Sequence, residues 1–164
     1  MAFQIQNHTT PDKLEEYSFL WSEVRLVVAS VALFIGGVPP VIAFNPIPSM
    51  YPLIQSSLTL CWIISGVAVA YLLYRWNKSG KTLFGERRPY DMYAFFAMIV
   101  TGLNLGITGL FGRNFGMSIF SGRTIFVIAG AVYLVTAYYL HKRWIESGKR
   151  MFSLNQNKSS SVIK

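Results

Sequence analysis

Two segments combine serine, glycine and lysine as phosphate-binding loops do. Residues 75–84 and 143–152 share the pattern Arg-Trp-x-x-Ser-Gly-Lys-x-apolar-Phe, 68 residues apart. A Walker loop needs a glycine five residues before its Gly-Lys pair, and both segments have arginine there. We therefore interpret the shared basic and aromatic residues as anchors at lipid headgroups. These anchors are Arg75, Trp76, Lys81, Arg143, Trp144 and Lys149.

The apolar pairs that close both segments, Leu83-Phe84 and Met151-Phe152, are expected to dip back into the membrane interface. The glycine before each pair is expected to end a helix.

A second polar set lies within an apolar stretch and consists of Thr101, Asn104 and Thr108. At about 100° per residue these three share one helix face. Asn104 has two readings, an interhelical hydrogen bond or a substrate contact inside a cavity. We favour the hydrogen bond, because the sequence places no acidic or basic residue at the same depth in any span.

Glycines form a neighbouring face of the same stretch and allow another helix to approach closely. Two further glycines, Gly66 and Gly130, lie 64 positions apart in other apolar segments. The predicted helix-packing glycines are Gly102, Gly106, Gly109, Gly66 and Gly130.

Residues suited to catalysis are few. His8 lies in the N-terminal arm, His141 ends the last apolar stretch, and Cys61 is a lone cysteine. No Cys/His spacing typical of zinc and no nucleophile elbow is present in the sequence. We expect neither an enzyme nor a metal or other cofactor.

Three uncharged stretches must position these residues. Residues 26–74 contain no charged side chain, and neither do the two shorter segments 92–112 and 124–140. About 20 apolar helical residues cross a bilayer, so the first uncharged segment is long enough to cross twice. Three prolines between Asn45 and Pro52 interrupt it. We predict spans near 26–44, 54–74, 92–112 and 124–140, with a frayed helix end and a Pro-rich loop, rather than a re-entrant turn, at the interruption.

The predicted fold class is all-α, a polytopic membrane protein of four transmembrane helices. Thr10 as N-cap and Pro11 as first residue predict a short interfacial helix before span one. The expected organisation is an arm (1–25), a first hairpin (26–84), a second hairpin (85–152) and a polar tail (153–164). The shared motif makes the hairpins tandem copies in the same orientation.

The distribution of basic residues predicts the orientation of the chain in the membrane. Thirteen basic residues fall in the N-terminal arm, the middle loop and the C-terminal tail, whereas only Arg113 and Arg123 fall in the other two loops. The positive-inside rule then puts both termini in the cytoplasm. Basic segments beside a membrane also attract anionic lipid, so lipids are expected partners and nucleic acid is not.

The run Gly102-Leu103-Asn104-Leu105-Gly106 with Gly109-Leu110-Phe111, the short loop after it and Arg123 opening the next helix resemble the domain-of-unknown-function family 378. That family consists of small two-span membrane proteins. The resemblance implies that the second hairpin is one family unit and the first a diverged copy. Leu105 departs from the family's usual Trp, and no activity is implied.

These observations favour a structural or accessory membrane protein, which associates through its small-residue faces with itself or with a larger membrane complex. The alternative is a small oligomeric channel or transporter for a neutral solute. The absence of charged residues from the predicted spans weighs against an ion-coupled carrier.

Overall fold

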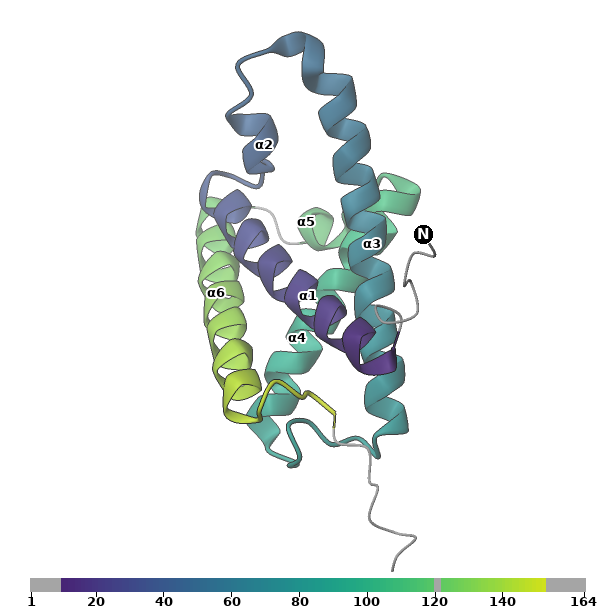
Figure 1. Cartoon of the computed structure of the whole chain (residues 1–164). Helices are drawn as coiled ribbons and strands as arrows, with labels where there is room; N and C mark the ends of the chain where they lie inside the picture. The colour runs from purple at the N-terminus through teal and green to yellow at the C-terminus, as the bar shows by residue number, and fades with distance from the viewer. Residues whose placement is uncertain (1–9, 120–121, 153–164) are drawn as a thin grey trace, which may run out of the picture.

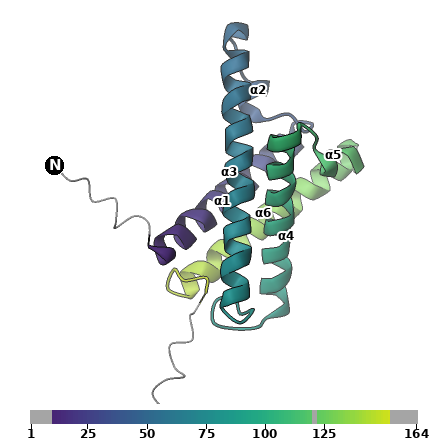
Figure 2. The same ribbon diagram turned by 90° about the vertical axis from the view of Figure 1, so that its right-hand side faces the viewer.

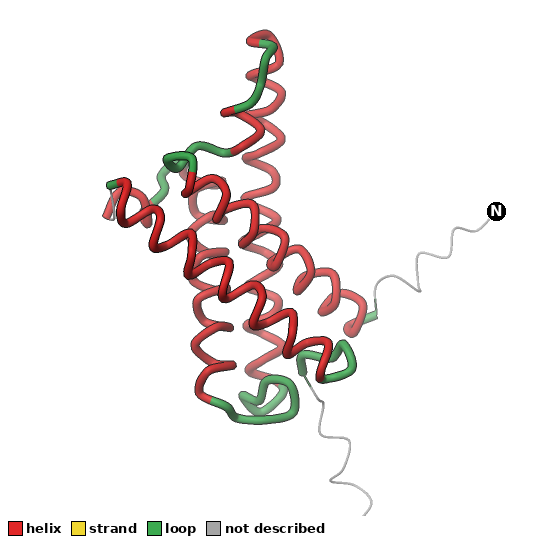
Figure 3. Tube along the Cα trace, turned by 90° about the vertical axis from the view of Figure 1, so that its left-hand side faces the viewer, coloured by secondary structure: helices red, strands yellow, loops and turns green. Residues whose placement is uncertain are grey.

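The computed structural model describes residues 10–119 and 122–152. Within them lie four long helices: α1 (Pro11–Phe34), α3 (Tyr51–Lys78), α4 (Pro89–Phe111) and α6 (Arg123–Glu146). Three short ones connect them: α2 (Pro40–Ala43), η2 (Pro48–Met50) and α5 (Phe115–Ile119). These residues form no strand, as Figure 3 shows, so the all-helical prediction is confirmed. His8 and the polar tail lie outside the described residues.

Four helices are long and apolar enough to cross a membrane: Pro11–Phe34, Pro48–Lys78, Pro89–Phe111 and Arg123–Glu146. Even the shortest has 23 residues, which rise about 35 Å against a hydrocarbon core of roughly 30 Å. The chain is therefore an integral, multi-pass membrane protein.

The first helix differs from the prediction. Instead of a short interfacial helix followed by a span over 26–44, one continuous helix runs from Pro11 to Phe34. Thr10 does occupy the N-cap position, although its side chain makes no capping hydrogen bond. The helix ends early because Gly36 and Gly37 adopt φ of 98° and 85°, and Pro39-Pro40 then start a new turn.

The long helices form two pairs. Their most extensive contacts join α3 to α4 and α1 to α6. Figure 2 shows α3 and α4 side by side, with α1 and α6 crossing them obliquely. We call the end where α1 and α4 begin, and α3 and α6 end, the basic end; it lies at the bottom of Figure 1. The described chain starts and finishes there.

The buried apolar side chains gather in the half of the bundle nearest the basic end. Its centre contains Phe19, Leu26, Leu72, Phe95 and Leu140, all fully buried. By contrast, no residue from Val31 to Ile64 is buried. In Figure 1, α2 and the first turns of α3 rise beyond the ends of the other long helices.

The predicted packing glycines lie at contacts within the chain. A Cβ on Gly106 would lie 2.7 Å from the Cα of Gly66, so α3 and α4 cross with backbones touching. Gly102 faces Val69 and Gly109 faces Ile63, both on α3. In the other pair, Gly130 of α6 faces Phe34 of α1. This small-residue face is therefore already used to build the bundle.

Candidate functional site

The two arginines of the repeated motif each hold an acidic side chain from the first turns of another helix. Arg75, in the last turn of α3, binds Glu15 of α1, with Nη2 to Oε2 at 2.7 Å and Nε to Oε2 at 3.1 Å. Asp12 adds a contact of 3.2 Å. Arg143, in the last turn of α6, binds Asp91 of α4 through two oxygens, at 3.0 and 3.1 Å.

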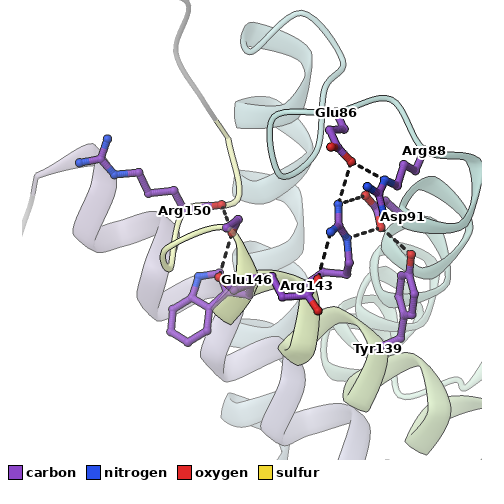
Figure 4. Close-up of polar contacts among 9 residues, drawn as sticks. Glu86, Arg88, Asp91, Tyr139, Arg143, Glu146 and Arg150 are labelled. Carbon is purple, nitrogen blue, oxygen red and sulfur yellow. Dashed lines mark hydrogen bonds and ion pairs between the residues drawn. The ribbon is translucent and has the colours of Figure 1, made fainter.

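Figure 4 shows the second cluster, in which Asp91 lies between Arg143 and Tyr139. Its side chain is fully buried, and the Tyr139 hydroxyl donates a third hydrogen bond of 2.7 Å to it. Arg143 also reaches Glu86 and Glu146, and Arg88 pairs with Glu86 at the rim. Because the buried carboxylate has its charge and its lone pairs matched, it is tolerated at the edge of an apolar bundle.

Glu15 also binds the chain's C-terminal segment. Its Oε1 accepts the backbone N–H groups of Met151 and Phe152, both at 3.1 Å. One carboxylate thus joins the start of α1, the end of α3 through Arg75, and the segment after α6. Motif spacing gave no signal for this acid, because its partners are 60 and more residues away.

The two motif segments adopt the same backbone conformation. In each, the serine hydroxyl donates to the carbonyl of the tryptophan three residues before it, at 2.9 Å from Ser79 and 2.8 Å from Ser147. Gly80-Lys81 and Gly148-Lys149 all have φ between 62° and 74°. Both lysines remain exposed. A glycine is favoured at the first position because it adopts the left-handed region at no steric cost.

The anchor interpretation needs correction for several residues. Trp144 is buried and packs on Phe19, with ring centroids 5.4 Å apart, while Trp76 packs edge-on against Phe96. The arginines are occupied by carboxylates. Of the six predicted anchors, the exposed Lys81 and Lys149 remain candidates for contact with lipid headgroups. The Leu83-Phe84 and Met151-Phe152 pairs are also buried in the core and do not return to the interface.

Asn104 makes a different contact from the one predicted. Its Nδ2 donates to Asn114 Oδ1 at 2.8 Å, and its Oδ1 accepts the Gly116 N–H at 3.2 Å. It therefore joins α4 to the short helix α5 rather than to another span. Thr108 bonds back to the Asn104 carbonyl, and Thr101 faces α1.

Arg25 was missed by the sequence reasoning. Assigned to the N-terminal arm, it lies within α1 and is only 7% exposed. Its guanidinium reaches the Met98 carbonyl at 2.9 Å and Thr101 Oγ1 at 3.2 Å. Thr101 is the tenth of the 21 uncharged residues from Met92 to Gly112, so the charge sits near mid-depth. The expectation that no span contains a charge at this level was wrong.

Two further contacts position α1. The Trp21 indole N–H donates to Ser65 on α3 at 3.0 Å, and Glu23 contacts His141 Nδ1 on α6, also at 3.0 Å. His141 is half exposed, as an interfacial residue would be. Together with Arg25, these residues connect α1 to all three other long helices.

The described part of the chain contains no group of three or more His, Cys, Asp or Glu side chains that could hold a metal ion. Cys61 is a half-buried thiol within α3. A shallow, mostly apolar groove runs along the α3–α4 seam, lined by Ala70, Leu73, Tyr74, Trp76, Asn77 and Leu103.

Fold and geometry define the class, a four-span helical membrane protein whose helix ends are fastened by two buried ion-pair clusters. No family model, no curated protein and no solved structure matches the chain. The resemblance to family 378 therefore gains no support from these comparisons.

Proposed function

We propose that the chain is a structural or accessory integral membrane protein, without enzymatic activity, that works as a homo-oligomer. The observation that carries the proposal is the apolar projection, which we define as residues 38–55: α2, η2 and the first turn of α3. It has no charged residue, and none of its residues is buried.

Length supports a position beyond the hydrocarbon core. Counting from Tyr74, the last uncharged residue of α3, about 20 helical residues cover the roughly 30 Å of lipid tails. That count ends near Gln55. Apolar side chains before it, such as Phe44 (72% exposed) and Leu53 (64% exposed), then lie where lipid tails no longer cover them. Exposed apolar surface of this kind is typical of protein–protein contacts.

A second copy of this chain offers a matching surface. At the same end of the molecule, the end of α4 and α5 expose Phe111, Phe115 and Ile119. The projection carries no charged residue, and Arg113 is the single charged residue within 111–119. Pairing the projection of one copy with this patch on the next is a head-to-tail contact, which closes into a ring when the rotation allows.

The test is the oligomeric state in lipid nanodiscs. Phe44→Ser with Leu53→Ser should shift the protein to monomers, while Val135→Ser should not, although Val135 on α6 is comparably exposed at 67%. In a Cys61→Ser background, Leu53→Cys on one copy should form a disulfide with Phe115→Cys on another. A wild-type monomer at all protein concentrations would contradict the proposal, and another membrane protein captured at the projection would identify a hetero-complex instead.

The proposed orientation puts both termini in the cytoplasm, because the basic residues gather at the basic end. Exposed Lys81 and Lys149 there would contact anionic headgroups. Tags at the two ends should both be inaccessible to a reagent added outside intact cells.

We also propose that the hairpins are tandem copies. Three likenesses support this: the shared motif conformation, an arginine at the end of the second helix of each hairpin, and its acidic partner in the first turns of the helix before it. Glu15–Arg75 and Asp91–Arg143 are the equivalent pairs.

Arg25 favours a second candidate, a channel or transporter, because an ionisable side chain at mid-depth often serves solute movement. A buried cation on the path favours an anion over a neutral solute. Flux of a small anion or a neutral solute through liposomes, lost in Arg25→Gln, would favour transport over the accessory function.

A further inference from the structure

Arg25 is a buried cation whose charge no side chain of the described chain balances. The charges of the two motif arginines are balanced, because Arg75 and Arg143 each bind a carboxylate at 3.1 Å or less. Within residues 10–119 and 122–152, the hydrogen-bond acceptors of Arg25 are both neutral, the Met98 carbonyl and the Thr101 hydroxyl oxygen, and the neutral Tyr133 also lies nearby.

One of the three guanidinium nitrogens of Arg25 makes no hydrogen bond within the described part of the chain. Its Nε is buried and has no hydrogen-bond partner among the protein groups described. The two η nitrogens bond groups of α4, and Nε lies in the same enclosed place without a partner among the described residues. A buried N–H on a charged group is costly to leave unpaired.

Arg25 keeps its charge although it is buried. Arg remains protonated in proteins, and its helix α1 is held on three sides by Ser65, Thr101 and His141, so the side chain cannot simply turn out to water. A buried charge of this kind is paired or hydrogen-bonded in stable membrane proteins. Arg25 already bonds the Met98 carbonyl, and an anion that accepts the Nε–H would supply both the absent hydrogen bond and the absent negative charge.

We propose that Arg25 binds a small monovalent anion, with chloride as the fitting chemistry, through its Nε–H. One negative charge neutralises one guanidinium, whereas a divalent anion would leave a second charge buried. An enclosed position 7% exposed to solvent selects a small ion over an organic acid. The inference is independent of the proposed oligomer.

The primary test is equilibrium binding of radioactive chloride to the purified wild-type protein in detergent. Saturable binding of about one ion per chain, competed by bromide but not by gluconate, is the expected result. Binding should disappear in Arg25→Gln and persist in Arg87→Gln, since Arg87 is an exposed arginine that bonds only the Gly80 carbonyl. Wild-type protein without saturable binding would overturn the inference and leave water as the partner of Nε.

A second measurement covers the case in which Arg25→Gln does not fold. The midpoint of thermal unfolding of the wild type is compared in chloride and gluconate at equal ionic strength. Chloride should raise the midpoint in a saturable way, because a ligand that binds only the folded state stabilises it by mass action. Equal midpoints in both salts at all concentrations would also refute the site.

Discussion

Arg143 holds both carboxylate oxygens of Asp91, at 3.0 and 3.1 Å, across 52 residues of sequence. This pair joins the start of α4 to the end of α6, the two long helices of the second hairpin. Its counterpart, Arg75 with Glu15, joins the start of α1 to the end of α3. Both hairpins are thus closed at the basic end by the same chemistry, and these contacts lead to direct tests.

Removing the acid of the second pair should be severe. Asp91→Ala leaves Arg143 buried without its main partner, and breaking a buried pair costs about 3–5 kcal/mol. Glu146→Ala removes only an exposed contact of the same arginine and should cost about 0–1 kcal/mol. Denaturant or SDS unfolding in detergent measures both variants. Equal losses would show that Arg143 depends on neither acid in particular.

For the first pair, a double-mutant cycle separates charge from packing. Glu15→Leu should destabilise strongly, because Arg75 and the Met151 and Phe152 N–H groups lose their acceptor. Adding Arg75→Met should recover part of the loss, since apolar replacement of a buried pair is often tolerated. The free energies of unfolding of both single variants and the double variant give the coupling. A purely additive cycle would contradict a direct interaction.

The Gly66–Gly106 crossing should not accept a side chain. In Gly106→Ala the new Cβ would lie 2.7 Å from the Cα of Gly66, forcing α3 and α4 apart at a cost of about 1–3 kcal/mol. Val100→Ile adds one carbon to a lipid-exposed position on the same helix and should leave stability nearly unchanged. Thermal unfolding compares the two variants. Because Gly106 faces α3 of the same chain, its variants are expected to change folding rather than self-association.

Asn104 should control the order of α5. Asn104→Ala removes the bonds to Asn114 and to the Gly116 N–H, worth about 0.6–2 kcal/mol within a membrane bundle. Hydrogen exchange of residues 113–119 should accelerate while exchange in α1 stays the same. As a control, Ser118→Ala removes only a local bond to the Asn114 carbonyl. Unchanged protection of α5 in Asn104→Ala would show that other contacts hold it.

The uncharged stretches predicted the number of helices and their membrane location because hydrocarbon solvation depends on composition alone. The same reasoning failed at the first helix. Charges at Glu23 and Arg25 made residues before Leu26 look like an aqueous arm, yet these side chains are buried against α6 and α4. A charge is excluded from lipid, not from the interior of a bundle that supplies hydrogen bonds.

The glycines show a related limit. Spacing on the helix placed Gly102, Gly106 and Gly109 on a face for close packing, and they do face a neighbour. Spacing cannot say whether that neighbour belongs to the same chain, and here it is α3. Likewise, the repeated motif revealed two equivalent segments, but their arginines looked like headgroup anchors because both acids lie far away in sequence.

What the sequence by itself determined is local: four apolar runs, their interruptions, a repeated segment and the gathering of basic residues at alternate loops. Only the tertiary structure decided which charges are paired, that the glycine face is internal, and that Arg25 lies at mid-depth with no carboxylate of the described residues bound to it. The physical reason is that solvation and helix periodicity act on neighbouring residues, whereas ion pairs and helix crossings join residues tens of positions apart and exist only once the helices have packed.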